Sequence, residues 1–254
     1  MGPTETASWR LLKISALLNS LVAWLLVAGT AVVSAQTFPL APGYVVQTLA
    51  VFTGLLFVLA PFLPQHLPLT RFGPANQVTL LRAGIAALMA GLVGGPIPES
   101  VLAGWMAGLA GLAMLLDGLD GWLARRGGWE SRFGARFDME IDAFLILTLA
   151  VLVWQSGKTG GWVLLSGALR YGFVALGQVL PWLRQPLPPR RRRQAICVIQ
   201  TAALILCLTP WLTPRWATGW AASALALLTL SFAIDVIGLA RQACTGPSAT
   251  GQTG

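Results

Sequence analysis

The sequence has very few charged residues. Only 10% of its 254 residues are Asp, Glu, Lys or Arg, whereas hydrophobic residues make up 56%. A soluble domain carries roughly a quarter of charged residues. The scarcity of charge therefore argues against a soluble globular protein and predicts an integral membrane protein.

Histidine and cysteine are also scarce. The single histidine, His66, lies in a proline-rich connector, where we expect a solvated loop residue; acid–base catalysis by histidine is therefore not predicted. The three cysteines, Cys197, Cys207 and Cys244, have no CxxC spacing. Without this spacing, the cysteines predict neither a metal site nor a disulfide.

Long apolar runs account for most of the chain, and a membrane-spanning helix needs about 20 such residues. The candidate spans are 14–34, 44–63, 78–97, 100–122, 139–156, 161–183, 194–212 and 216–239. The runs are joined by short loops, which predicts an all-α, polytopic membrane helix bundle of about eight helices.

The polar residues divide the chain into parts. Residues 1–63 form a two-helix N-terminal membrane segment, and 64–74 is a polar, proline-rich linker. Residues 75–240 form a six-helix unit that contains the informative polar residues. The tail, 241–254, is small and polar, which predicts flexibility.

The N-terminus also has features of a signal peptide. Arg10 and Lys13 precede an apolar run that ends in Val33-Ser34-Ala35, a sequence like a cleavage site. The run is longer than the usual apolar region of a signal peptide, which favours an uncleaved anchor. Cleavage is the alternative.

Basic residues outnumber acidic ones, with a net charge of +8. If the N-terminus is cytoplasmic and the spans alternate, 14 of the 17 basic residues lie at the cytoplasmic side. These are Arg10, Lys13, Arg71, Arg82, Arg125, Arg126, Arg132, Arg136, Arg184, Arg190, Arg191, Arg192, Arg193 and Arg241. The positive charge thus reflects topology and contact with anionic lipid, and no nucleic-acid partner is predicted.

Acidic residues are concentrated in one stretch: six of the nine lie in residues 115–142. Asp117 and Asp120 are three apart near the end of one predicted helix, and Asp138 and Asp142 are four apart at the start of the next. Each pair therefore shares a helix face. The glycine-containing connection reverses the chain, so two adjacent antiparallel helices bring four carboxylates together.

Four neighbouring carboxylates repel one another and are costly at a membrane boundary. Clustered oxygen ligands suit hard cations such as Mg²⁺ or Mn²⁺, and four can hold two ions that clamp a phosphoryl group. The expected substrate therefore carries a diphosphate. Gly121 and Gly134 leave room for a ligand, and Arg125 offers a guanidinium for phosphate oxygens.

The alternative is a solvated ion-pair network between these aspartates and the arginines nearby, which are Arg125, Arg126, Arg132 and Arg136. Glu140 lies about 200° around the helix from Asp138 and Asp142. We expect it to pair with an arginine or to face a neighbouring helix, and Glu130 to be a loop residue.

The spacing resembles a family signature. The pattern Asp117-x2-Asp120-Gly121-x2-Ala124-Arg125-x8-Gly134-x3-Asp138-x3-Asp142 is similar to that of the CDP-alcohol phosphotransferases, the CDP-alcohol phosphatidyltransferase family, at all eight fixed residues and every spacing. Upstream, Asn76, Thr79 and Arg82 resemble the family's N-x-x-T-x-x-R. The resemblance covers 75–240, the six-helix core, and favours it over the solvated network.

The resemblance implies that an alcohol displaces CMP from a CDP-linked donor with two divalent ions, Mg²⁺ or Mn²⁺. Asp117 and Asp138 would contact both ions, Asp120 the first and Asp142 the second. Asp142 would also be the general base. The implied donor contacts are Asn76, Thr79, Gly121, Ala124, Arg125, Ser131 and Gly134. A homodimer is implied by resemblance alone.

The motif does not identify the lipid substrate. The short chain and its cytoplasmic arginines resemble bacterial enzymes that use CDP-diacylglycerol and a soluble alcohol at the inner membrane. The alternative is transfer from a soluble CDP-alcohol, of choline or ethanolamine type, to diacylglycerol. A transporter with an acidic ion site would more often have dispersed carboxylates near the membrane midplane.

Two features bear on the acceptor. Arg170 lies within a predicted span, where it either binds an acceptor phosphate or pairs with Asp235 or a motif aspartate. Arg190 and Arg191, in the basic run 186–194, either line the acceptor site or anchor the chain on anionic lipid. If these arginines line the site, an anionic acceptor such as glycerol 3-phosphate or an inositol phosphate is expected.

Overall fold

The computed structural model describes residues 3–96, 100–180, 182 and 191–245. The helices in this part of the chain are α1 (Pro3–Thr37), α2 (Tyr44–Leu59), α3 (Pro74–Ala90), α4 (Ser100–Gly127), α5 (Arg132–Gln155), α6 (Leu165–Val179), α7 (Arg191–Leu208) and α8 (Pro214–Thr245). Two short 3-10 segments, η1 (Ala60–His66) and η2 (Gly161–Leu164), precede α3 and α6. The described residues contain no strand, and all eight predicted helices are confirmed.

Five segments are long and apolar enough to cross a membrane. They are Thr6–Thr37, Tyr44–His66, Ala103–Gly127, Gly161–Val179 and Pro214–Ala240. The other three helices are not among these segments: α3 has only 17 residues, α5 carries side chains of the polar cluster described below, and α7 begins with three arginines. The composition of the five segments confirms an integral membrane protein.

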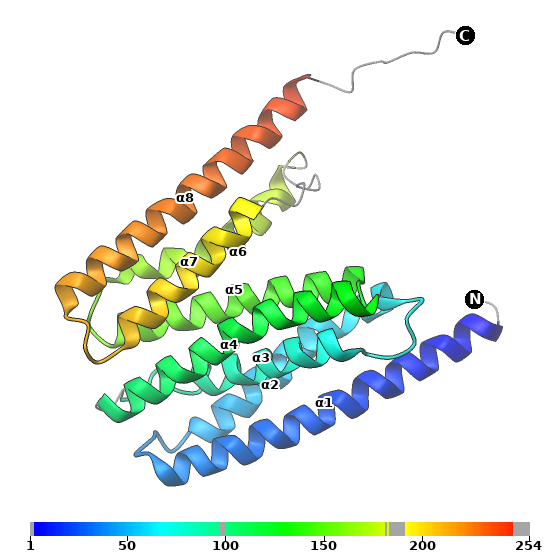
Figure 1. Ribbon diagram of the computed structural model, residues 1–254, viewed down its shortest axis with the longest axis horizontal. Coiled ribbons are helices and arrows are strands. Elements are labelled where there is room, and N and C mark those ends of the chain that lie inside the picture. Colours follow the sequence, from blue (N-terminus) through cyan, green and yellow to red (C-terminus); the bar gives the residue numbers. More distant parts are fainter. Residues whose placement is uncertain (1–2, 97–99, 181, 183–190, 246–254) are drawn as a thin grey trace.

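Helix α3 lies at the centre of the bundle (Figure 1). It packs against α1, α2, α4 and α5, and most of its residues are buried. Its small residues permit this close packing: a Cβ on Gly84 would lie 2.7 Å from Val27 of α1, and one on Gly91 would meet Thr48 of α2. Small residues at helix contacts are typical of membrane bundles.

The carboxylate-bearing helices α4 and α5 are held by two common neighbours. Both α3 and α7 pack against each of them, and α7 also packs against α8. The α4–α5 connection lies at the same end of the bundle as the N-terminal end of α1 and the connection from α2 to α3 (Figure 1). The polar segments that were expected on one side of the membrane therefore lie at one end of the helix bundle.

The contact between α5 and α6 gives a first prediction. A Cβ on Gly167 of α6 would lie 2.5 Å from the Cα of Leu147, so Gly167→Ala must push the two helices apart. We expect this overpacking to destabilise the protein by about 1–3 kcal/mol. Thermal unfolding in detergent should show a lowered midpoint. Gly172→Ala, on the same helix with nothing within 4 Å of the added Cβ, is the matched control. Equal midpoints for the two variants would contradict this packing.

Candidate active site

The four aspartates of the acidic stretch converge on one arginine, Arg82, which α3 carries between α4 and α5. Its Nη1 lies 2.8 Å from Asp120 and 2.5 Å from Asp138. Its Nη2 lies 2.6 Å from Asp117 and also contacts Asp142. Arg82 is 1% exposed, so its guanidinium lies in the interior at the junction of three helices, whereas Asp117, Asp138 and Asp142 are partly exposed. We predicted that the two carboxylate-bearing helices would meet directly, and the role of α3 between them was not predicted.

Four carboxylates around one guanidinium leave an excess of negative charge. Single oxygens of Asp117, Asp120 and Asp138 lie within 4.8 Å of one another, while Asp142 joins the cluster through Arg82. An all-carboxylate set suits Mg²⁺ or Mn²⁺ and lacks the nitrogen and sulfur ligands typical of zinc. The residues present therefore fit one or more hard divalent cations.

The predicted Asn76 and Thr79 occupy the same face of α3 as Arg82, one turn apart. The Thr79 hydroxyl lies 3.1 Å from an oxygen of Asp120 and 3.1 Å from the backbone carbonyl of Ala75, and these two acceptors share its proton. Asn76 donates to the carbonyl of Phe72 at 2.6 Å, and its Oδ1 would lie 3.0 Å from a Cβ at Gly134. Thr79 thus orients a carboxylate, while Asn76 packs between α3 and the first turn of α5.

A cavity of about 210 Å³ adjoins this cluster. Two of the aspartates and most of the predicted donor contacts line it; these residues are Asp120, Asp138, Thr79, Gly121, Ala124, Arg125, Ser131 and Gly134. The other lining residues are Ala75, Trp129, Glu130 and Ala135, which the sequence argument did not select. Glu130 is a loop residue as predicted, but it lies at the cavity.

The two motif glycines allow close approach in different ways. A Cβ on Gly121 would lie 3.2 Å from the guanidinium of Arg125, so glycine leaves room for that side chain. At Gly134 a Cβ would crowd Asn76 and, at 3.2 Å, the Ser131 hydroxyl. The second glycine therefore serves helix packing as well as the cavity that it lines.

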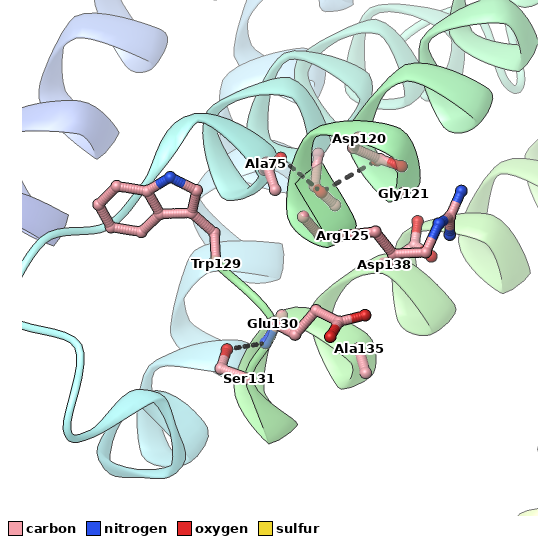
Figure 2. Close-up of a pocket in the computed structure, with 12 residues that line it drawn as sticks. Ala75, Asp120, Gly121, Arg125, Trp129, Glu130, Ser131, Ala135 and Asp138 are labelled. Carbon is pink, nitrogen blue, oxygen red and sulfur yellow. Dashed lines mark hydrogen bonds between the residues drawn. The ribbon is translucent and has the colours of Figure 1, made fainter. Parts of the chain in front are cut away.

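The far side of the cavity is aromatic. Figure 2 shows Trp129 on one side and Asp120 with Asp138 on the other. The indole lies against two glycines: a Cβ on Gly73, where φ is +80°, would be 2.7 Å from it, and one on Gly127 would be 2.5 Å away. A flat apolar surface and a cluster of carboxylates therefore share one cavity.

Helix α5 begins beside the cavity at an N-cap. The Ser131 hydroxyl accepts a hydrogen bond from the Gly134 backbone N–H at 2.9 Å, which satisfies an amide of the first turn. The same oxygen lies 2.7 Å from Nδ1 of His66. His66 was predicted to be a solvated loop residue, and this is wrong: it is fully buried. Its second nitrogen bonds to the backbone of Arg71, so burial satisfies both polar atoms.

The structure gives Arg170 a partner that we did not predict. Its guanidinium lies 2.9 Å from Glu140 of α5, so the alternative that it pairs with Asp235 or a motif aspartate is wrong. Glu140 pairs with an arginine, as predicted. Asp235 instead pairs with Arg192 at 2.5 Å. The contacts of Arg190 and of the Arg191 side chain lie outside the described residues.

A second, larger cavity is apolar. It measures about 430 Å³ and is lined by residues of α1, α2 and η1, by Leu80, and by the aromatic residues Phe72, Phe133 and Phe137. Lys13 is its only charged lining residue among the described part of the chain. It has no carboxylate, so the polar cavity is the candidate active site.

Comparison with known families gives a match to the part of the chain that carries most of this cavity and the carboxylate cluster. The profile of a family described as CDP-alcohol phosphatidyltransferase matches residues 72–232, which is more than half of the chain. The match includes α3 to α7 and most of α8, but not α1, α2 or η1. Neither the curated proteins nor the solved structures gave a match.

Proposed function

Because the chain belongs to the CDP-alcohol phosphatidyltransferase family, a family of phosphotransferases of phospholipid synthesis, we propose that it transfers a phosphatidyl group from CDP-diacylglycerol to an alcohol. CMP is the leaving group. The observation that carries the proposal is the polar cavity, where a carboxylate cluster and the residues matched to donor positions lie together. The excess of cytoplasmic arginines supports a site at the cytoplasmic face.

The four carboxylates are assigned two roles, as ligands of divalent ions and as the general base. Asp120 is only 5% exposed and bonds to both Thr79 and Arg82, which makes it a fixed ligand. Asp117, Asp138 and Asp142 are 29%, 39% and 27% exposed, so exposure does not distinguish among these three, and the choice of the base follows the resemblance of the motif. We assign Asp142 as the general base, with Asp117, Asp120 and Asp138 completing the metal ligands together with it.

The proposed reaction is a single displacement. Asp142 accepts the proton of the acceptor hydroxyl, the alcohol oxygen forms a bond to the lipid-linked phosphorus, and the bond from that phosphorus to CMP breaks. Mg²⁺ or Mn²⁺ bound to the carboxylates would neutralise charge on the diphosphate. Arg125 lines the cavity and offers its guanidinium to phosphate oxygens.

The acceptor is proposed to be anionic. Arg170 of α6 pairs with Glu140, which lies on the opposite face of α5 from Asp138 and Asp142. Arg192 is paired with Asp235, and the proposal of an anionic acceptor rests on the basic run that begins α7. Glycerol 3-phosphate and an inositol phosphate are therefore the acceptors to test first. The homodimer that the resemblance implies stays a prediction.

Measurement of CMP release by the purified protein tests the function. CDP-diacylglycerol and Mg²⁺ or Mn²⁺ are supplied with glycerol 3-phosphate, inositol phosphate, inositol, serine or choline. We expect release with an anionic acceptor and loss of at least about 100-fold in EDTA, because the carboxylates then repel the diphosphate. Restoration by added Mg²⁺ is the control.

Two other outcomes would change the proposal. Release from CDP-choline or CDP-ethanolamine with diacylglycerol, and none from CDP-diacylglycerol, would reverse the donor and acceptor. Ion or solute flux across vesicles without CMP release from any donor would favour transport and contradict transfer.

A further inference from the structure

His66 connects the N-terminal segment to the polar cavity. It is the last residue of η1 and precedes residues 72–232 of the family match, yet its Nδ1 lies 2.7 Å from the hydroxyl of Ser131, which lines the cavity. The contact spans 65 residues of sequence. A residue outside the matched core thus touches the cavity wall.

The partners of His66 determine its protonation pattern. Nε2 lies 2.9 Å from the backbone carbonyl of Arg71, an atom that can only accept, so Nε2 carries the proton. Burial favours the neutral ring, in which Nδ1 is then an acceptor. The hydroxyl of Ser131 must therefore donate its proton to Nδ1.

This arrangement leaves the Ser131 oxygen as an acceptor. Its proton is directed to His66, and one lone pair accepts from the Gly134 backbone N–H. A serine oxygen has a second lone pair, which remains for the cavity that Ser131 lines. Such an oxygen attracts N–H and O–H groups and repels the acceptor-only oxygens of a phosphate.

We infer that His66 is a positioning residue: it fixes the Ser131 hydroxyl as a hydrogen-bond acceptor for an N–H or O–H group of the nucleoside in the donor. This rests on the proposed function. The group is a ribose hydroxyl or the exocyclic amine of the base. The carboxylates on the opposite side of the cavity then face the diphosphate.

The surrounding contacts show why the histidine can hold this orientation. Its ring packs edge-on against Phe133 of α5, with centroids 5.8 Å apart. Phe62 of η1 lies under the guanidinium of Arg136, 3.7 Å from its carbon to the ring centre. Segment η1 is therefore attached to the first turns of α5 by two contacts besides the hydrogen bond. Loss of that bond alone should leave the packing in place.

Substitutions separate positioning from packing. His66→Phe keeps an aromatic ring against Phe133 but removes both hydrogen bonds. We expect the KM for the CDP donor to rise roughly 3- to 10-fold, the effect of one hydrogen bond, with kcat and the acceptor KM within about twofold of wild type. His66→Asn, which can return an acceptor near the Nδ1 position, should recover part of the donor affinity. Gln65→Ala, at an exposed neighbouring residue, is the matched control.

A double-mutant cycle shows whether His66 acts through Ser131. In the Ser131→Ala background, His66→Phe should cause no further rise in donor KM, because the hydroxyl that it orients is gone. If the rise in donor KM of the double variant equalled the product of the two single rises, the two residues would act independently and the inference would be overturned. A fall in kcat with unchanged donor KM would overturn it as well.

Donor analogues identify the nucleoside group. Ser131→Ala should have no effect on the KM of an analogue that lacks the contacted group. The analogues are a 2′-deoxyribose donor, a 3′-deoxyribose donor and a uridine donor without the exocyclic amine. The analogue that becomes insensitive names the contact. Equal sensitivity of all three analogues and the natural donor would contradict a hydrogen bond to any of these groups.

Spectroscopy gives a test that does not need turnover, since the chain contains a single histidine. In protein labelled with ¹⁵N-histidine, we expect an Nε2–H tautomer whose Nδ1 signal shifts when CMP and Mg²⁺ are added. An Nδ1–H tautomer would overturn the inference. If the wild type releases CMP and the His66 variants have the same donor KM, only the positioning role is refuted. If the wild type releases no CMP from any donor, the proposed function is refuted too.

Discussion

Replacement of Asp142 by Asn should lower kcat by about 10²- to 10⁴-fold, the usual contribution of a general base. The asparagine keeps an oxygen for Arg82, so the helix junction should remain intact. It cannot accept the proton of the attacking alcohol. Donor affinity should be partly retained, since Asp117, Asp120 and Asp138 still offer three carboxylates.

Initial rates of CMP release, together with binding of the donor in the absence of acceptor, measure this difference. Glu140→Gln is the control on the same helix: it neutralises a carboxylate that pairs with Arg170 instead of joining the cluster. We expect this control to change kcat by less than about threefold. Unchanged turnover of Asp142→Asn would refute the role of Asp142 as base.

The fold could be predicted from local patterns. Hydrophobic runs of the right length located all eight helices because a lipid environment requires continuous apolar segments. The i,i+3 and i,i+4 spacing of the aspartates placed each pair on one helix face, because residues three or four apart are neighbours on a helix surface. The N-cap of α5 at Ser131 was not predicted, although a serine before a helix is a local signal for one.

Contacts between distant segments could not be predicted in this way. Arg82 was counted as a cytoplasmic charge, although its position two turns after Asn76 on α3 was a signal that it faces the same side. His66 looked like a connector residue, because nothing in its neighbourhood indicates that Ser131 lies against it. The partner of Arg170 depends on how α6 lies on α5, and several carboxylates were equally available in the sequence. Each of these errors concerns tertiary packing and not helix formation.

Arg82→Leu should destabilise the protein strongly when divalent ions are removed. The guanidinium is almost fully buried and contacts all four aspartates, so its loss leaves adjacent carboxylates without a positive partner. Removal of one partner from a buried ion pair typically costs about 3–5 kcal/mol. Thermal unfolding in EDTA should therefore show a midpoint well below that of the wild type.

Divalent ions provide the decisive comparison. Mg²⁺ that binds the folded cluster raises its stability by mass action, so addition of Mg²⁺ should recover more stability in Arg82→Leu than in wild type. Arg82→Lys keeps one positive charge but cannot contact four carboxylates, so its unfolding midpoint should lie between those of wild type and Arg82→Leu. This variant replaces Arg82→Leu in the experiment if the leucine variant does not fold. Arg125→Gln, at an exposed arginine of the cavity, is the control and should unfold close to wild type. If Arg82→Leu and wild type had the same unfolding midpoint in EDTA, this arginine would not stabilise the four carboxylates. Other contacts would then have to hold α3, α4 and α5 together.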